Sequence, residues 1–475
     1  MSKSLKIILF AIAGLLGLLI LTAVVLIFFV DASVYKPRLE RATSEALGME
    51  VHVDGRVRIA FFPGLQIRFD DVRVRNREMD VVSAKKASLE IALLPLLHKE
   101  VLIRKIGLTS PTIAIQRDRD GVFNFEIREE AKRIFPGLVL NNLSLADGVF
   151  LYKDEQSGGV FEARKFNLNM TGFSLAEGNS GERLKKLSFT AEFTCPEIRT
   201  TNLLLSNVKV TCKGKDGIFA LNPITMSLFG GHGAGSIGAD FTGSIPSYSV
   251  RSSLSKFRIE EYFQTISSKK VAEGAMDFSA SLSLRGHTVK EIKQSAGGEV
   301  FLRGENILLY GNDLDREFAR YESSQNFNLV DVGAFFFAGP LGLAVTKGYG
   351  FASIFQGAGG TSVIGKLFSD WKVEHGIAQA RDVAMATRHN RIALQGRVDF
   401  VDERFDNVTI ALIDARGCAR VKQKITGPFR KPVVEKPNVL MSLVGPVVNL
   451  LKQAKRLFPG GKCKAFYTGS VQAPE

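Results

Sequence analysis

Short segments in which apolar and polar residues alternate recur along this chain, and this pattern restricts its fold more than any other feature. One runs from Phe61 to Asn76 (FFPGLQIRFDDVRVRN), where apolar residues occupy odd positions before Asp70-Asp71 and even positions after it. A period of two is typical of a β-strand with one buried face. The change of phase predicts a β-bulge or tight turn at Asp70-Asp71, which re-aims the strand and preserves one apolar face.

Other segments show the same alternation and predict strands at residues 51–59, 113–115, 143–145, 166–170, 278–284, 383–385, 392–400 and 408–412. Turns are predicted at Pro63-Gly64, Pro136-Gly137, Asp147-Gly148 and Ser157–Gly159. The run LFGGHGAGSIGADF predicts strand, glycine turn, strand. A short amphipathic helix is predicted from Ala32 to Leu47, before Gly48. The residue pattern therefore predicts a mainly β fold with a few short helices.

The N-terminal segment from Ile7 to Val30 contains no charged residue. It exceeds the roughly 20 apolar residues that a membrane-spanning helix needs, and it is too long for a cleaved signal peptide. We therefore expect an uncleaved transmembrane anchor. Its orientation stays open, because lysine and arginine flank it almost evenly on both sides.

A formal net charge of +14 suits an anionic membrane surface and a nucleic acid equally well. Arginines gather in sequence at positions 56, 58, 68, 73, 75 and 77. No recognised nucleic-acid module surrounds them, so we expect no nucleic acid partner. Two interpretations remain for these arginines: a patch that contacts lipid headgroups, and an outer strand face in water.

Motifs of catalysis are missing or incomplete, so no enzyme, metal or cofactor is expected. The run Gly233–Gly238 matches the dinucleotide fingerprint, but no helix follows it to face a pyrophosphate. The run Gly360–Lys366 resembles a phosphate loop but has Leu367 where Ser or Thr should follow. The six histidines are scattered, and the chain has no H-E-x-x-H, zinc-finger spacing or G-x-S-x-G.

The chain has four cysteines, Cys195, Cys212, Cys418 and Cys463, which allow three pairings. Pairing between neighbours, Cys195 with Cys212 and Cys418 with Cys463, is the simplest. Disulfides favour an oxidising compartment such as a bacterial periplasm. Four reduced thiols remain the alternative.

Polar and glycine-bearing segments near residues 175–186 and 267–274 suggest boundaries. We expect an anchor at 1–30, a membrane-proximal β domain at 31–175, a middle β segment at 176–272 and a C-terminal β region at 273–475. The apolar, glycine-rich stretch at 327–355 fits a membrane-touching loop or a buried segment. A basic amphipathic helix at 440–458 fits either the membrane interface or a cap on its own sheet.

The order of these features resembles the AsmA family of envelope proteins. The resemblance rests on ALGMEVHVDGRVRIAFFPGLQIRFDDVRVRN after an N-terminal helix, and then on NNLSLADGVFLYKDEQSGG and LFGGHGAGSIGADF. It continues through GENILLYGNDLD and HGIAQARDVAMATRHNRIALQGRVDFVDERFDNVTIAL to the Cys418–Cys463 tail. It implies an inner-membrane anchor and a periplasmic body shaped as an elongated, curved, groove-like antiparallel β-sheet, in a protein linked to phospholipid movement and outer-membrane biogenesis.

The resemblance leads to a functional hypothesis: a hydrophobic β groove that binds or transfers phospholipid between the inner and outer membranes. The expected partners are phospholipids and the inner membrane, together with outer-membrane or periplasmic envelope proteins. The alternative is a non-catalytic scaffold for outer-membrane protein assembly, whose apolar face is filled by its own side chains. The predicted groove lining is Leu65, Ile67, Phe69, Val72, Val74, Phe278, Leu282, Leu284, Ile392, Leu394, Val398 and Phe400.

Overall fold

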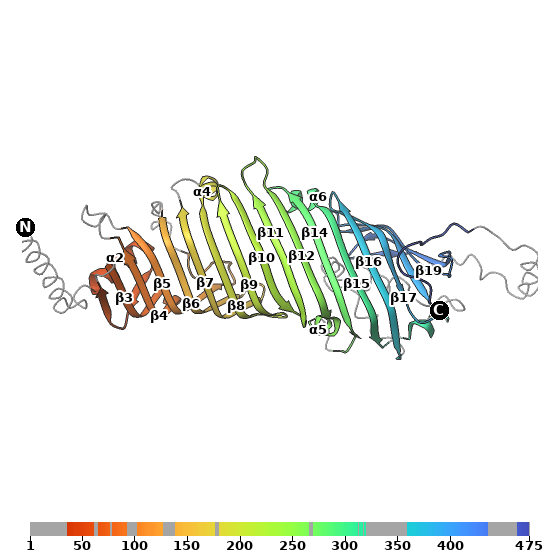
Figure 1. The fold of residues 1–475 in the computed structure, drawn as a ribbon, viewed down its shortest axis with the longest axis horizontal. Coiled ribbons are helices and arrows are strands. Elements are labelled where there is room, and N and C mark those ends of the chain that lie inside the picture. Colours follow the sequence, from red (N-terminus) through yellow and green to blue (C-terminus); the bar gives the residue numbers. More distant parts are fainter. Residues whose placement is uncertain are drawn as a thin grey trace, which may run out of the picture. The chain divides into compact units, whose positions relative to one another are not determined.

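In the computed structural model, the described residues are 36–60, 65–76, 78–92, 102–126, 138–175, 180–265, 269–311, 313–316, 318–319, 359–435 and 463–474. The chain forms two compact units, Met1–Phe219 (unit 1) and Ala220–Glu475 (unit 2). Both are built mainly from β-strands with few helices (Figure 1), as the alternation predicted. Composition suggested boundaries near residues 175 and 272, whereas the two units divide at Phe219.

Unit 1 is a mainly antiparallel sheet in which β3 to β9 pair in chain order, with β1 and β2 both on the outer edge of β3. One pair departs from the predicted antiparallel arrangement, since β5 and β6 are parallel. Residues 118–137 join them, long enough for the crossover that parallel strands require. The elements are α2 (Lys36–Leu47), β1 (Glu50–Val53), β2 (Val57–Ala60), β3 (Leu65–Asn76), β4 (Met79–Ile91), β5 (Ile103–Arg117), β6 (Leu138–Asp154), β7 (Val160–Leu175), α4 (Ser180–Lys186), β8 (Ser188–Thr200) and β9 (Leu204–Lys215).

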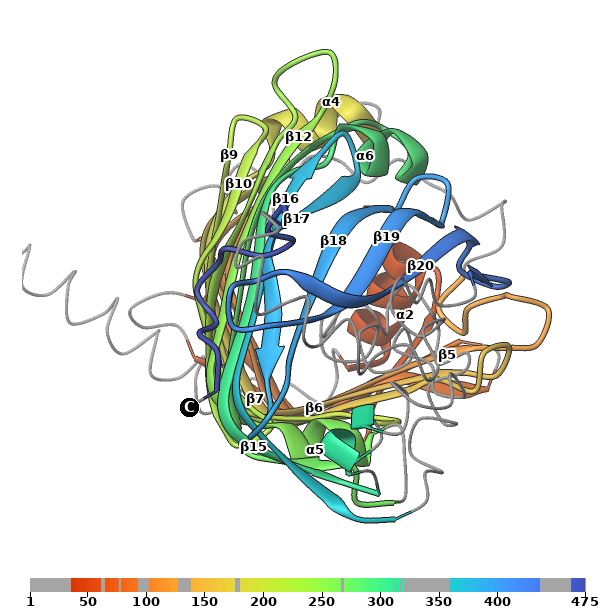
Figure 2. The ribbon, with the colours of Figure 1, turned by 90° about the vertical axis from the view of Figure 1, so that its right-hand side faces the viewer.

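Unit 2 continues with antiparallel pairs from β11 to β21, with β13 paired to β15 beside the β12–β14 pair. Figure 2 shows β18, β19 and β20 turned towards the concave side of β15 and β16. The elements are β10 (Ile218–Leu228), β11 (Gly231–Asp240), β12 (Ser247–Arg258), α5 (Ile259–Gln264), β13 (Ala272–Glu273), β14 (Ala275–Arg285), α6 (Val289–Ser295), β15 (Gly297–Tyr310), β16 (Thr361–Glu374), β17 (Ile377–Ala386), β18 (Arg391–Asp399), β19 (Arg404–Ile413), β20 (Ala419–Pro428) and β21 (Val433–Val434).

The helix predicted before Gly48 is confirmed as α2. Gly48 has φ 66° and its N–H donates to the Ser44 carbonyl over 2.8 Å, which is a glycine helix end. The Glu40 carboxylate accepts the Val53 N–H at 2.7 Å and so ties α2 to β1. No helix among the described residues is long and apolar enough to cross a membrane. The predicted anchor, the glycine-rich stretch at 327–355 and the helix at 440–458 lie outside the described residues.

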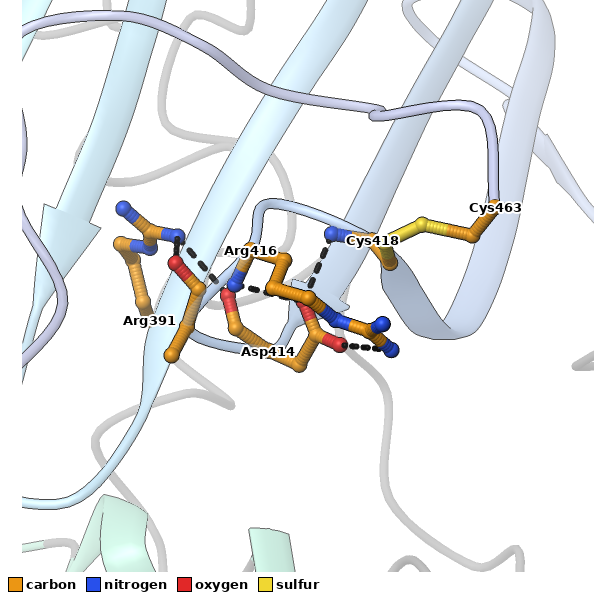
Figure 3. The surroundings of a disulfide bond; sticks show 6 residues. Arg391, Asp414, Arg416, Cys418 and Cys463 are labelled. Carbon is orange, nitrogen blue, oxygen red and sulfur yellow. Dashed lines mark hydrogen bonds and ion pairs between the residues drawn. A yellow bond between two sulfur atoms is a disulfide. The ribbon is translucent and has the colours of Figure 1, made fainter. Parts of the chain in front are cut away.

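The disulfide between Cys418 and Cys463 is present, with the two Cα atoms 6.1 Å apart. Figure 3 shows its surroundings: Asp414 accepts the Cys418 N–H through its carboxylate at 2.8 Å, and Arg391 donates to the Asp414 carbonyl at 2.8 Å. The disulfide fastens the C-terminal segment, whose Phe466, Tyr467 and Val471 pack against alanines of β17–β19.

The predicted pairing of Cys195 with Cys212 is wrong, because both thiols are free. The two strands form the expected hairpin, but its register sets Cys195 opposite Val208 and Cys212 opposite Ala191. Four residues along a strand span about 13 Å. A disulfide needs Cα atoms within about 7 Å.

Candidate functional site

Most strands of unit 1 contain one residue with an unusual backbone conformation, and these residues lie next to one another across the sheet. Residues in the left-handed region, where non-glycine residues are rare, occur inside the strands at Asp71, Ser110, Asp147, Lys165 and Asn207, with φ between 47° and 55°. Asp147-Gly148, predicted as a turn, is instead part of this irregularity within β6, whereas the turn at Ser157–Gly159 is confirmed.

Strand register places these residues in one row across the sheet. The paired residues directly before and after them set Asp71 of β3 opposite Lys85 of β4, and Lys85 opposite Ser110 of β5. Ser110 lies beside Asp147 in the parallel pair, and Pro196 lies opposite Asn207. We call this row the crease; its members are Asp71, Lys85, Ser110, Asp147, Lys165, Pro196 and Asn207.

At the crease, consecutive inward-facing residues are three positions apart instead of two. Phe69 and Val72 of β3 belong to one apolar cluster, which confirms the predicted change of phase at Asp70-Asp71. It is not a bulge of β3, because β3 and β4 keep their register there and residues 54–56, between β1 and β2, oppose only Asp70 and Asp71. In β6 and β7, a Cβ at Gly148 would touch the Phe166 ring at 2.6 Å, so both residues lie on the same face. The three-residue steps are Phe69–Val72, Ala84–Ala87, Leu108–Pro111, Leu145–Gly148, Ala163–Phe166, Cys195–Ile198 and Leu205–Val208.

Each step keeps both halves of its strand apolar on one face, which we call the inner face of unit 1. Residues that flank the crease are mostly buried, while those further out on both sides are half-buried. Figure 2 shows these strands curved, with α2 on their concave side. The half-buried apolar residues of the inner face are Leu89, Ile106, Ile113, Ile115, Leu143, Phe150, Phe161, Leu168, Met170, Phe193 and Val210.

Aromatic contacts show that the inner face is continuous from strand to strand. The Phe166 and Phe193 rings stack with centroids 5.9 Å apart, on β7 and β8. On the other side of the crease, the Phe150 and Phe161 rings meet edge to face at 5.7 Å, on β6 and β7. Several of these strands were predicted from the alternation, but none of these residues was predicted as a site residue. Alternation within each strand indicates which residues share a face, but only the pairing register between strands shows that they form one continuous surface, and the sequence does not give that register.

The predicted lining residues of β3 lie on the inner face, but part of them is covered. Ile67 and Phe69 are buried in a cluster with Leu39 of α2, and Val72 packs against it. Leu65 and Val74 are half-buried. The covered part of the inner face therefore lies around Ile67 and Phe69, while most of its half-buried apolar residues lie on β4 to β9.

The lining residues predicted in unit 2 belong largely to a closed core. Ile392 and Leu394 are buried, at 0% and 6% exposure, in a cluster that includes residues of β12, β14, β15 and β20. Phe278, Leu282, Val398 and Phe400 pack against that cluster, and Leu284 is half-buried. The prediction that Ile392 and Leu394 face an open groove is wrong, because β18–β20 turn inward and cover them with protein.

The arginines near the N-terminus lie on the opposite, outer face of β2 and β3. The Arg58 guanidinium contacts the Asp70 carboxylate at 2.6 Å, and Arg73 Nε donates to Asp54 at 2.7 Å. The hydrogen bond and charge of Asp54 raise the pKa of Arg73 above its usual value. Arg75 contacts Asp80 at 3.1 Å. Contact with lipid headgroups remains a prediction for this face, and Arg77 lies outside the described residues.

The two glycine motifs lie in strands. Gly233–Gly238 belongs to β11, which pairs with β12, and a turn at Phe229-Gly230 precedes it. Gly360–Lys366 leads into β16. Neither motif meets a helix N-terminus, as phosphate binding by such loops requires. Among the described residues, no three His, Cys, Asp or Glu side chains gather closely enough to hold a metal ion.

A family model described as the AsmA family matches residues 1–175 and 180–328. No curated protein matches the chain.

Proposed function

Since the chain belongs to the AsmA family, we propose that it is an envelope protein whose inner face in unit 1 binds phospholipid acyl chains and carries them between the inner and outer membranes. The observation that carries this proposal is the row of half-buried apolar side chains on β4 to β9, on both sides of the crease.

The physical basis is the burial of hydrocarbon on a surface without a specific pocket. Each methylene removed from water contributes about 0.8 kcal/mol. Contiguous exposed apolar surface on a soluble body marks an interaction site. The outer face meanwhile carries ion-paired side chains such as Arg164 with Glu162, at 2.8 Å, which keep that side in water.

Location in the inner membrane, with the body in the periplasm, is part of the same proposal. Two observations support it: the uncharged segment Ile7–Val30 and the Cys418–Cys463 disulfide, which suits an oxidising compartment.

A scaffold for outer-membrane protein assembly is the second candidate, and the closed core of unit 2 favours it. There the apolar face is occupied by the chain's own side chains, including Ile410 and Leu412 at 1% and 0% exposure. If unit 1 bound a protein segment instead of lipid, its inner face would have the same composition.

A photo-crosslinking amino acid at Phe193 tests the two candidates, with Thr194 as the matched control. Phe193 lies on the inner face and Thr194, the next residue of β8, is exposed on the outer face. In cells, the probe at Phe193 should capture phospholipid and the probe at Thr194 should not. Capture of protein alone at Phe193 would refute lipid binding and favour the scaffold.

A further inference from the structure

The outer face of unit 2, opposite its closed core, contains an open pocket of about 460 Å³, within the size range of small-molecule sites. It lies across β12, β14 and β15. On these strands Leu254, Phe278 and Leu302 pack in or against the core, so their neighbours in sequence face outward by strand alternation. The lining residues used below are Ser253, Lys256, Asp277, Ser279, Phe301 and Arg303.

The pocket is hollow because short side chains form its floor and longer ones form its wall. Ser253 of β12 lies opposite Ser279 of β14, and neither side chain extends far beyond the backbone. On β15, Phe301 lies opposite Ser279 and Arg303 lies opposite Asp277. The two strand spacings from β12 to β15 span about 10 Å. The floor is therefore wide enough for one six-membered ring with its substituents.

The charged groups of the wall are held in fixed positions. Arg303 Nε donates to Asp277 Oδ2 at 2.8 Å, and Arg303 Nη2 lies at the same distance from that oxygen. The Lys256 N–H donates to Asp277 Oδ1 at 2.8 Å. The Lys256 N–H, followed by Arg303, lowers the pKa of Asp277, so its carboxylate stays ionised. The guanidinium is thus held by one edge, and Nη1 on its other edge can donate to a ligand.

The pocket carries one positive charge in excess. Lys256 and Arg303 are cationic, and Asp277 is the one acidic residue that lines the pocket. Asp277 contacts Arg303 directly, which leaves the Lys256 ammonium without a matching carboxylate in the pocket. A ligand with one negative charge would complement this charge.

Phe301 gives the pocket an apolar wall beside these polar groups. Its side chain is half-buried, and its ring meets the Phe368 ring of β16 edge to face at 4.9 Å, which fixes its orientation. The face of an aromatic ring carries negative partial charge and attracts the weakly positive C–H groups of a ligand. A sugar ring presents such C–H groups on its faces, while its hydroxyls project outward to donate and accept hydrogen bonds. Phe301 with serines and a fixed arginine beside it therefore suits a sugar.

We propose that this pocket binds a saccharide that carries a carboxylate. The sugar ring packs on Phe301, its hydroxyls bond to Arg303 and the floor serines, and its carboxylate lies near the Lys256 ammonium. A phospholipid fits less well, because the outward-facing residues of β12 and β14 are serines and charged residues that offer no surface for acyl chains. An acidic peptide matches the charge but lacks the sugar's C–H faces. The site lies on the outer face of unit 2 and does not depend on the function proposed for unit 1.

The test uses the full chain in a polyoxyethylene detergent, because glucoside and maltoside detergents carry sugar headgroups that would compete. The two disaccharide probes are N-acetylglucosaminyl-N-acetylmuramic acid and chitobiose, which differ only in the lactyl group that bears the carboxylate. Glutamyl-glutamate is the peptide probe. Saturation-transfer NMR detects contact with the protein, and titration calorimetry measures affinity.

Three variants separate the contributions. Ser279→Tyr fills the floor of the pocket. Ser283→Tyr is its matched control, because it adds the same side chain to the same face of β14 outside the pocket. Lys256→Asn removes the charge, and asparagine tolerates the left-handed φ of 52° at this position. The melting temperature of each variant shows whether it folds.

The wild type should bind the acidic disaccharide about threefold more tightly than chitobiose, the value of one exposed ion pair. The C–H protons of the bound sugar ring should receive the strongest saturation. Lys256→Asn should bind both disaccharides equally, Ser279→Tyr should bind neither, and Ser283→Tyr should behave as wild type.

Absence of saturation transfer to both disaccharides in the wild type, or unchanged binding by folded Ser279→Tyr, would overturn the site. Equal affinity of the wild type for the two disaccharides, or an undiminished difference in Lys256→Asn, would overturn the position of the carboxylate. Glutamyl-glutamate bound as tightly as the acidic disaccharide would show a site for acidic peptides and refute the saccharide. If Ser279→Tyr does not fold, the wild type and Lys256→Asn still decide between these outcomes.

Discussion

Because of the crease, substitution of lysine by glycine should have opposite effects on stability at two exposed positions. Lys165 of β7 and Lys209 of β9 are both exposed on the outer face of unit 1. Lys165 lies in the crease with φ 55°, whereas Lys209 pairs regularly with Thr194 and has no such conformation. We expect Lys165→Gly to stabilise the fold and Lys209→Gly to destabilise it.

The magnitude follows from backbone conformation. A non-glycine residue in the left-handed region costs about 1–2 kcal/mol. Glycine removes that cost but adds about 0.5–1 kcal/mol of unfolded-state entropy to be lost on folding. Lys165→Gly should therefore raise the free energy of unfolding by up to about 1.5 kcal/mol, with a central value of about 0.75 kcal/mol. At Lys209 only the entropic term acts, so the same change should lower it by about 0.5–1 kcal/mol.

Urea unfolding of the full chain, followed by fluorescence and circular dichroism, measures both variants against wild type. Lys165→Val is a further check, because a β-branched residue is disfavoured where φ is positive and should destabilise. If both glycine variants shift the unfolding midpoint in the same direction, the left-handed conformation of Lys165 does not strain β7.

Three further predictions concern unit 2. Serine at both Cys418 and Cys463 should cost about 4 kcal/mol for a loop of this separation. Calorimetry should then show that a reductant lowers the melting temperature of the wild type and leaves the variant unchanged; no effect on the wild type would contradict this. The Lys256 N–H, followed by Arg303, lowers the pKa of Asp277 below its ordinary 3.8. That stabilisation is present above pH 3.8 and is lost as the pH falls through the folded pKa, so Asp277→Asn should flatten the acid side of a urea-midpoint profile. An unchanged acid limb would argue against it. Burial, and then its bond to Asp382, raises the pKa of Tyr467 above 10.0. The resulting stabilisation is complete below pH 10.0 and is lost as the pH rises through the folded pKa, so Tyr467→Phe should unfold less steeply in alkali; an equal alkaline loss in both proteins would refute this.

Local features of the fold were predictable from the sequence. Alternation identified the strands, and the phase change at Asp70-Asp71 marked the point where Asp71 takes its left-handed conformation. The sequences of β4 and β7 show the same change of phase, because Lys85-Lys86 and Arg164-Lys165 place two adjacent charged residues between apolar positions. Only strand register shows that these pairs form one row.

Features that depend on distant contacts were not predictable in this way. Ile392 and Leu394 are separated by Ala393, so this run is apolar on both faces, and all three residues are at most 6% exposed. The run indicates a strand covered on both faces, but the elements that cover it are set by the inward turn of β18–β20, which no local pattern encodes. The cysteine error has the same origin, since the hairpin register between β8 and β9 separates Cys195 from Cys212.

The difference between the units also decides where a ligand can bind. In unit 1 the crease brings the two halves of each strand together and buries the residues beside it, such as Leu145 and Phe166, at 8% and 4% exposure. Further out, the described residues leave Phe150, Phe161 and Phe193 only half-covered. In unit 2, β18–β20 cover the corresponding face, so hydrocarbon added there would have to displace side chains that are already buried. Because burial contributes only when surface is removed from water, acyl chains should bind to the inner face of β4–β9 and not beneath β18–β20.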